Sequence, residues 1–339
     1  TITPAISAPT KTQKFGRPFG YWNKHLLSGK PRLFIANKVS YRYRMTHSEH
    51  SILIGVDGGG TGCRVAVGTL ADGVLAQAEG GPANATSDIA LAIQNVASTI
   101  EVALKTAGLS ASDATVHVGL AGVMGRNEVD KIAAAFPYKT ITVTDDRPTA
   151  ITGALGGKDG YLLSIGTGSI AAASKVSKFA YVGGWGFQVS DHASGAWLGR
   201  AALEQVLLCF DGLAEHTALT REIFKKYNQD PNKIVTFCQS ATPRDYAALA
   251  PDIIKGAQEN DPWGRAIMGK GAAFLMRNLT RLGFQNGDTL CLSGGVGPHY
   301  ADYLPKGANQ GLIPPQGSAL DGAFQLAKQA LMDRLEQQA

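Results

Sequence analysis

This chain of 339 residues lacks long apolar runs, paired cysteines and the two commonest phosphate-binding motifs. No run reaches the roughly 18 apolar residues that a membrane-spanning helix needs, so we expect no membrane partner. The four cysteines, Cys63, Cys209, Cys238 and Cys291, form no CxxC pair and match no metal-finger spacing. Free thiols are typical of a reducing compartment, and we therefore predict a cytoplasmic protein.

Neither standard nucleotide motif fits the glycine-rich parts of the sequence. Walker A requires Ser or Thr after its Gly-Lys pair, yet Lys30, Lys158 and Lys270 are followed by Pro, Asp and Gly. The dinucleotide motif GxGxxG would need its third glycine at Cys63 or Val65. Both a P-loop NTPase and a Rossmann dinucleotide domain are therefore excluded.

Acidic residues are missing from the first 44 positions, which carry nine Lys or Arg. The rest of the chain has 23 basic and 27 acidic residues, so the net charge of +5 describes this first segment alone. The residues after this segment contain no basic stripe that would indicate a nucleic-acid partner. The segment also lacks the apolar core of a signal peptide, although its composition fits another kind of targeting peptide. We expect residues 1–44 to be a disordered or non-native extension, with the native start near Met45.

The segment GVDGGGTGCRVAV, residues 55–67, places an acidic residue between an apolar strand and a glycine run. The glycines permit a turn in which backbone N–H groups approach phosphate oxygens without a Cβ in the way. A second strand, CRVAV, follows at once, so the loop is a hairpin. Asp57 would then face the Mg²⁺ of a bound nucleotide. The alternative is a plain glycine-rich turn between two core strands.

Two later segments repeat the pattern of an apolar strand followed by small residues. YLLSIGTGSIAAAS spans residues 161–174, and TLCLSGGVG spans residues 289–297. Three such loops suggest a duplicated domain that holds a nucleotide between its halves. At this level the chain resembles the actin, hsp70 and hexokinase superfamily, in which the loops serve as phosphate 1, phosphate 2 and adenosine motifs.

A closer resemblance covers almost everything after Met45. The segments DGGGTGCR, GGPAN, TDD, IGTGS, GGWGFQVSDHASGAW, ATPRDYAALAP, LSGGVG and PPQGSALDGA occur in the order typical of bacterial glucosamine and N-acetylglucosamine kinases of the BadF/BadG-type ATPase group. This resemblance implies an α/β fold of two duplicated actin-like (ribonuclease H-like) domains with an interdomain cleft. The implied domains are residues 45–156 and 157–317, with a terminal helix in residues 318–339 that returns to the first domain.

Local patterns add individual helices to this outline. A helix capped by Thr86 or Ser87 should run to Lys105 and stop at Gly108. Long helices are expected after Pro243 and Pro262.

The resemblance also implies a catalytic base. Phosphoryl transfer to a hydroxyl needs a carboxylate that accepts the proton, and TDD ends a predicted strand. The spacing to the following GALGG, as in the family, favours Asp146, with Asp145 as the alternative. Either residue could instead be an ordinary helix N-cap.

The cofactors implied by the resemblance are ATP and Mg²⁺, and the sugar is expected to contact three further residues. Asp57 would position the metal. The residues expected to bind the nucleotide are Asp57, Gly59, Gly60, Thr61, Arg64, Gly166, Thr167, Gly168, Ser169, Gly294, Gly295 and Gly297. Those expected at the sugar, beside Asp146, are Asn84, Asp191 and Trp185. Asn84 could equally be a turn residue and Asp191 a helix cap.

The resemblance predicts an ATP-dependent amino-sugar kinase acting on the 6-hydroxyl of glucosamine or N-acetylglucosamine, with glucosamine favoured. Two positions depart from the family pattern: His192 replaces a common Glu, and Arg147 replaces a small or aromatic residue. Arg147 could lower the pKa of the base, reach a phosphate or point to solvent. The competing hypotheses are an activator ATPase of a 2-hydroxyacyl-CoA dehydratase or benzoyl-CoA reductase, and a non-catalytic sugar-binding regulator. The acceptor sugar and the oligomeric state, including a homodimer, stay open.

Overall fold

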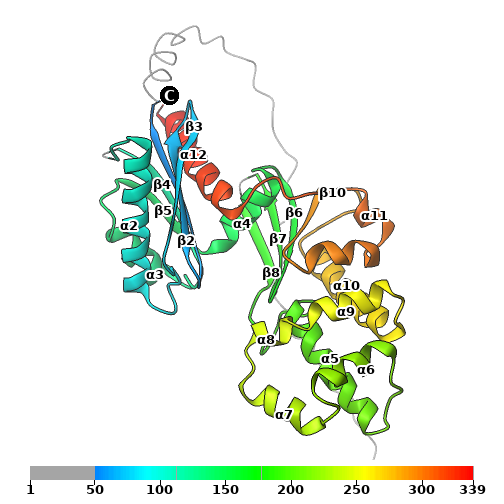
Figure 1. The fold of residues 1–339 in the computed structure, drawn as a ribbon. Helices are drawn as coiled ribbons and strands as arrows, with labels where there is room; N and C mark the ends of the chain where they lie inside the picture. The colour runs from blue at the N-terminus through cyan, green and yellow to red at the C-terminus, as the bar shows by residue number, and fades with distance from the viewer. Residues whose placement is uncertain (1–49, 112, 177, 339) are drawn as a thin grey trace, which may run out of the picture.

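The computed structural model describes residues 50–338, except residues 112 and 177 (Figure 1). The predicted extension, residues 1–44, lies outside this range. Within the described residues, no helix combines the length and the apolar character needed to cross a membrane.

The first half of the chain forms a five-stranded sheet in the order β3-β2-β1-β4-β5. Strand β1 pairs antiparallel with β2, and β2 antiparallel with β3, whereas β1, β4 and β5 are parallel. The strands are β1 (Ile52–Gly58), β2 (Cys63–Thr69), β3 (Gly73–Gly80), β4 (Thr115–Leu120) and β5 (Thr140–Thr144).

The second half repeats this topology strand for strand. Its sheet has the order β8-β7-β6-β9-β10. Strands β8, β7 and β6 pair antiparallel, and β6, β9 and β10 pair parallel, as their counterparts in the first sheet do. The strands are β6 (Gly160–Ile165), β7 (Ser169–Lys175), β8 (Lys178–Gly183), β9 (Leu290–Ser293) and β10 (Leu312–Ile313). The predicted duplication and the predicted α/β class are confirmed. The boundary between residues 156 and 157, in the turn that joins α4 (Asp146–Leu155) to β6, stays a prediction.

Helices α2 (Ile89–Ala107) and α3 (Arg126–Ala134) pack against the first sheet (Figure 1). Asp88, one residue after the predicted caps, accepts the N-terminal hydrogen bond of α2. Gly108 ends α2 in the left-handed conformation, as the sequence predicted. The apolar face of α2 packs on β1 to β3 through residues such as Val96 and Ile100, which are fully buried.

The terminal helix α12 (Ala319–Gln337) packs against the first sheet. Its residues Leu320, Phe324 and Leu331 pack against Leu53 of β1. Helix α12 also crosses α4 so closely that a Cβ at Gly322 would lie 2.0 Å from the carbonyl oxygen of Thr149. The equivalent helices of the two halves therefore meet between the sheets (Figure 1).

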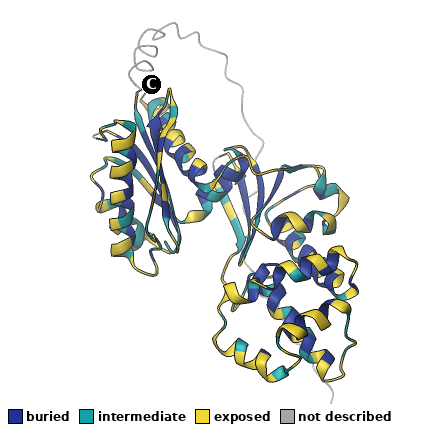
Figure 2. Cartoon of the chain, in the orientation of Figure 1, coloured by how far each residue is buried: buried dark blue, intermediate teal, exposed yellow. Residues whose placement is uncertain are grey.

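A helical region is inserted between β8 and β9. It contains α5 (Gly195–Phe210), α6 (Ala218–Lys226), α7 (Pro231–Ser240), α8 (Pro243–Ala247), α9 (Ala250–Gln258) and α10 (Pro262–Arg281), followed after β9 by η1 (Gly297–Tyr303) and α11 (Lys306–Asn309). The long helix predicted after Pro243 is wrong, because α8 ends at Ala247. Pro251 at the start of α9 cannot donate a backbone hydrogen bond or continue the preceding helix. Figure 2 shows buried residues concentrated on the strands and the inner helix faces.

Candidate functional site

Most of the predicted site residues lie at the carboxyl ends of parallel strands. Strands β1, β4 and β5 end at one edge of their sheet, and β6 and β9 end at the corresponding edge of theirs. Asp57 lies at the end of β1, Asp145 directly after β5, Gly166 after β6 and Gly294 after β9. The topology thus brings together segments from both halves of the chain, between Asp57 and Gly294.

A cavity of about 400 Å³ opens between the start of α4 and strands β6 to β8. Five of the predicted residues line it: Asp146, Gly166, Gly168, Ser169 and Asp191. Its apolar wall is formed by Leu162, Ile170 and Ala172, among others. This cavity is the candidate active site.

The two adjacent carboxylates at the start of α4 have different partners. Asp145 is the N-cap of α4 and accepts from the backbone N–H of Arg147 at 2.9 Å. Its oxygens also accept from the Arg147 guanidinium, at 2.6 Å from Nε and 2.8 Å from Nη2. Among the described residues, the Asp146 carboxylate accepts a hydrogen bond only from its own backbone N–H, and it opens onto the cavity. The capping role therefore falls to Asp145, and Asp146 faces the cavity.

The same partners separate the proton affinities of the pair. Burial would raise the pKa of Asp145, but the hydrogen bonds and charge of Arg147 outweigh it and hold that pKa below its usual value. For Asp146, partial removal from bulk water raises the pKa, and the charges of Asp145 and Asp57 add to the effect. A carboxylate with a raised pKa accepts a proton more readily, which suits a general base.

Two backbone amides of the loop after β6 point away from helix α5. The carbonyl oxygens of Gly166 and Thr167 accept from the first amides of α5, Gly195 at 2.8 Å and Ala196 at 3.2 Å. Because C=O and N–H point in opposite directions across a trans peptide, the amides of Thr167 and Gly168 point away from α5. Such a pair of amides fits a phosphate group.

The loop after β1 is arranged in a comparable way. Gly59 donates to Gly62 and closes the hairpin, while its carbonyl oxygen accepts from Ala83 at 2.8 Å. The Gly60 amide therefore points away from Ala83. A Cβ at Gly60 would meet no atom within 4 Å, so this loop offers an open surface.

Asp57 fits a nucleotide-bound Mg²⁺ in its donor type and position. Its Oδ2 forms an ion pair with Arg64, while hard carboxylate oxygens beside a phosphate loop match the preference of Mg²⁺ for one or two carboxylates plus substrate phosphates and water. Among residues 50–338 as the structure describes them, no three His, Cys, Asp or Glu side chains come together in a metal-binding group. The fit is therefore to a metal that arrives with the nucleotide.

The loop after β9 lies directly against the loop after β6. Gly294 has φ of +80°, and a Cβ there would lie 2.3 Å from the carbonyl oxygen of Ile165. Val296 donates to that same oxygen at 3.0 Å. Only glycine fits at position 294, where the two loops cross. Gly295 and Gly297, which are predicted to border the nucleotide, come next in the chain.

Asp191 is buried against the loop after β6. Its backbone is left-handed, with φ of +56°, and a Cβ at Gly168 would lie 2.6 Å from its Oδ2. Burial raises the pKa of Asp191, although a hydrogen bond from the Gly186 amide acts to lower it. Neighbouring His192 packs its ring on Phe274, with centroids 4.8 Å apart, and does not line the cavity.

Two of the predicted sugar-binding residues lie outside the cavity lining. Asn84 Oδ1 accepts from the amides of Thr86 and Ser87, as a turn asparagine does. It lies beside Gly122, just after β4, where a Cβ would approach within 2.5 Å of it. Trp185 is 78% exposed. Their contacts with a sugar stay predictions.

Two further features of the site were not predicted from the sequence. Tyr181 of β8 lines the cavity, and the Arg147 guanidinium lies 4.4 Å from the centre of its ring. Behind the strand ends, buried His117 contacts Thr144 Oγ1 at 3.2 Å, and Thr144 donates to the carbonyl oxygen of Asp145 at 2.7 Å. These hydrogen bonds connect β4 of the first sheet to the backbone of Asp145.

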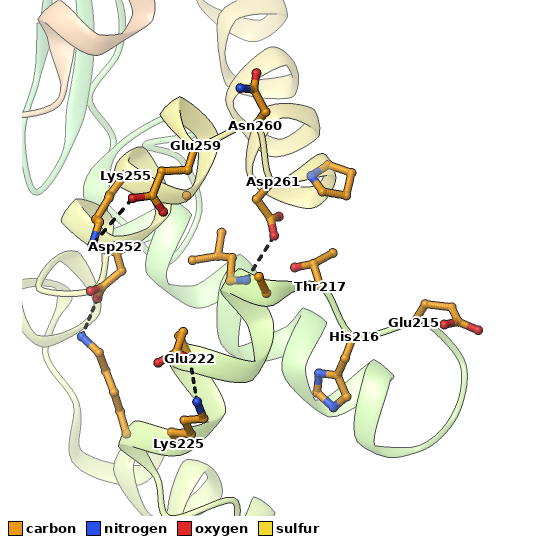
Figure 3. Close-up of a pocket in the computed structure, with 15 residues that line it drawn as sticks. Glu215, His216, Thr217, Glu222, Lys225, Asp252, Lys255, Glu259, Asn260 and Asp261 are labelled. Atoms are coloured by element: carbon orange, nitrogen blue, oxygen red, sulfur yellow. Dashed lines mark hydrogen bonds and ion pairs between the residues drawn. The ribbon is translucent and has the colours of Figure 1, made fainter.

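A larger cavity, of about 970 Å³, lies between α6 and α9 (Figure 3). Its charged side chains form three ion pairs: Lys225 with Glu222, Lys226 with Asp252, and Lys255 with Glu259. Asp261 in its wall caps α10 and accepts from the Leu219 amide at 3.1 Å. None of the predicted site residues lines this cavity, so its larger volume does not make it the candidate active site.

Two sheets of one topology, with glycine turns and a carboxylate at a shared cavity, are typical of the two-domain actin-like fold. A hexokinase of the ROK family from Thermus thermophilus shares this fold, with a TM-score of 0.53 at 16% identity, over 84% of this chain and 99% of that one. Residues 54–303 match the BadF/BadG/BcrA/BcrD ATPase family, and the chain belongs to this family.

Two relatives are more similar. The glucosamine kinase GspK of Vibrio cholerae is 33% identical over 279 residues, which are 81% of this chain and 95% of that protein. A crystal structure from Chromobacterium violaceum, assigned as an N-acetylglucosamine kinase, superposes with a TM-score of 0.70 at 34% identity. It covers 82% of this chain and 99% of its own.

Proposed function

We propose that this protein is an amino-sugar kinase that transfers the γ-phosphoryl group of ATP to the 6-hydroxyl of glucosamine or N-acetylglucosamine, with glucosamine favoured. The observation that carries the proposal is the Asp146 carboxylate, which faces a cavity shared with the second phosphate loop. The glucosamine kinase and N-acetylglucosamine kinase named above support the class of acceptor.

In this proposal the two glycine loops hold the phosphates of ATP. The amides of Thr167 and Gly168 would donate to one phosphate and that of Gly60 to another, since backbone N–H groups without nearby Cβ atoms suit phosphate oxygens. Asp57 would hold Mg²⁺ through water, and the metal would neutralise charge on the phosphates. Gly294, Gly295 and Gly297 would border the adenosine.

Asp146 would act as the general base. The acceptor hydroxyl gives its proton to the Asp146 carboxylate while its oxygen forms a bond to the γ-phosphorus. The bond between that phosphorus and the β,γ-bridging oxygen breaks, and ADP leaves with the electron pair. Asn84, Asp191 and Trp185 would contact the sugar after the domains close, which would also exclude water from the reaction.

A coupled assay of ADP release over a panel of sugars tests the proposal. We expect turnover with glucosamine or N-acetylglucosamine and much weaker turnover with glucose. Equal efficiency with glucose would refute the amino-sugar assignment and indicate a general hexokinase. Absence of sugar-dependent ADP release with every sugar would refute the kinase assignment and favour a sugar-binding regulator.

The activator-ATPase hypothesis makes a different demand on the cysteines. Its iron–sulfur cluster would need grouped thiols, whereas the free cysteines are spread over β2, α5, α7 and β9. The purified protein should accordingly be colourless. A brown, air-sensitive preparation would contradict the kinase proposal.

A further inference from the structure

Arg147 holds one carboxylate of an adjacent pair and leaves the other free. Both oxygens of Asp145 are bound by its guanidinium, in the two-pronged geometry that matches a carboxylate. Asp146, the next residue, opens onto the cavity. Without the guanidinium, Asp145 would keep its N-cap hydrogen bond but lose its cationic partner, and two carboxylates would stand side by side at the start of α4.

The Arg147 side chain is itself held from the opposite domain. Its guanidinium lies over the Tyr181 ring of β8 at 4.4 Å, so the aromatic face and the Asp145 carboxylate fix its plane together. The Tyr181 hydroxyl is buried and has no hydrogen-bond partner among the described residues. The ring, and not the hydroxyl, therefore supplies the contact.

We propose that Arg147 is a positioning residue of the kinase reaction: it binds Asp145 and keeps that carboxylate from the acceptor hydroxyl, so that Asp146 alone takes the proton. This inference rests on the proposed function. The physical reason is that two free carboxylates could each accept a hydrogen bond from the hydroxyl, and only one of the two orientations aims its oxygen at the γ-phosphorus.

Three charged groups act on the pKa of Asp146: Asp145 and Arg147 beside it in the chain, and Asp57 from β1. Asp191 and the neutral Tyr181 line the same cavity. Removing Arg147 alone leaves the charge of Asp145 without a partner, which raises the pKa of Asp146. Removing both charges together cancels most of that change.

The experiment measures kcat, both KM values and the pH dependence of kcat/KM for the full chain and a set of variants. Arg147→Met removes the guanidinium, and the double variant Asp145→Asn/Arg147→Met also removes the charge that Arg147 binds. Tyr181→Leu removes the ring contact. Arg126→Met serves as the matched control, because Arg126 on α3 is highly exposed and pairs only loosely with Asp130 at 3.9 Å.

We expect Arg147→Met to lower kcat by ~10-fold or more, with the ATP KM changed by less than about threefold. The acid limb of its pH profile should move to higher pH. The double variant should regain most of the lost kcat and return the acid limb toward that of the wild type, which a double-mutant cycle detects as coupling. The Tyr181→Leu variant should lose less kcat than Arg147→Met.

Three results would overturn the inference. The first is a wild-type kcat in Arg147→Met, and the second is no recovery of kcat in the double variant. The third is a loss of kcat in Tyr181→Leu equal to that in Arg147→Met, because this would assign the effect to packing. If Arg147→Met does not fold, Arg147→Lys keeps the charge but loses the two-pronged contact, and it should lower kcat with little movement of the acid limb. An inactive wild-type protein would refute the proposed function instead.

Discussion

Acid should destabilise this protein through one buried histidine. His117 lies in β4 with 4% of its surface exposed, and burial lowers its pKa from 6.5 to about 4. Its Nε2 contacts the hydroxyl of Thr144, which gives its own proton to the carbonyl oxygen of Asp145. Thr144 therefore accepts from Nε2, and above its lowered pKa the imidazole is neutral with its proton on that nitrogen.

The sign and size of the effect follow from these two pKa values. Between pH 6.5 and about pH 4 the unfolded chain binds the His117 proton and the folded chain does not, so stability falls as the pH falls through this window. The difference of roughly 2.5 pH units, at ~1.4 kcal/mol for each, corresponds to about 3 kcal/mol lost by the lower end. Above pH 6.5 this contribution is fully present.

Urea unfolding at a series of pH values measures the effect. A His117→Gln variant should show a weaker dependence of the free energy of unfolding on pH, by up to about 1 kcal/mol per pH unit inside the window. His299→Gln, at an exposed position, is the matched control and should keep the wild-type dependence. Identical slopes for the wild type and His117→Gln would refute the argument that His117 stays neutral in the folded protein.

Other substitutions test the catalytic assignments and the packing between the two halves. Asp146→Asn should bind both substrates but lose at least ~10²-fold in kcat, and Asp145→Asn should lose less; the reverse order, measured by steady-state kinetics, would move the base by one residue. Asn84→Ala and Asp191→Ala should each raise the sugar KM far more than the ATP KM, because an unpaired hydroxyl in a closed site costs about 1 to 3 kcal/mol. An equal rise of the ATP KM would assign Asp191 to the phosphate loop that it contacts. Gly322→Ala should lower the melting temperature, because its Cβ would lie 2.0 Å from a backbone oxygen of α4; an unchanged melting temperature would contradict this close crossing.

The strands and the duplicated order could be predicted because they depend on local patterns. Apolar runs that end in glycine, such as those before Gly58, Gly166 and Gly294, indicate both a buried strand and a turn. The terminal helix was likewise predicted almost to its ends. The break between α8 and α9 was missed although Pro251 was visible, because the apolar pattern continues across it.

The site could be predicted only in part, because its details depend on contacts between distant segments. The TDD motif indicates a carboxylate pair, but its division of roles depends on the side chain of Arg147 and on Tyr181 of another sheet. The burial of Asp191 against Gly168 likewise joins two loops that local patterns cannot place together. Asn84 shows the opposite case, since its turn contacts with Thr86 and Ser87 are local and were foreseen.

The most direct test of the central claim is to identify the product of the reaction. The protein is incubated with glucosamine, with N-acetylglucosamine and with ATP labelled at the γ-phosphoryl group, and the position of the transferred group is determined by phosphorus NMR. We predict a sugar 6-phosphate in a 1:1 ratio with ADP, and its loss in Asp146→Asn. Label released only as inorganic phosphate, or a phosphate on another sugar hydroxyl, would contradict the account.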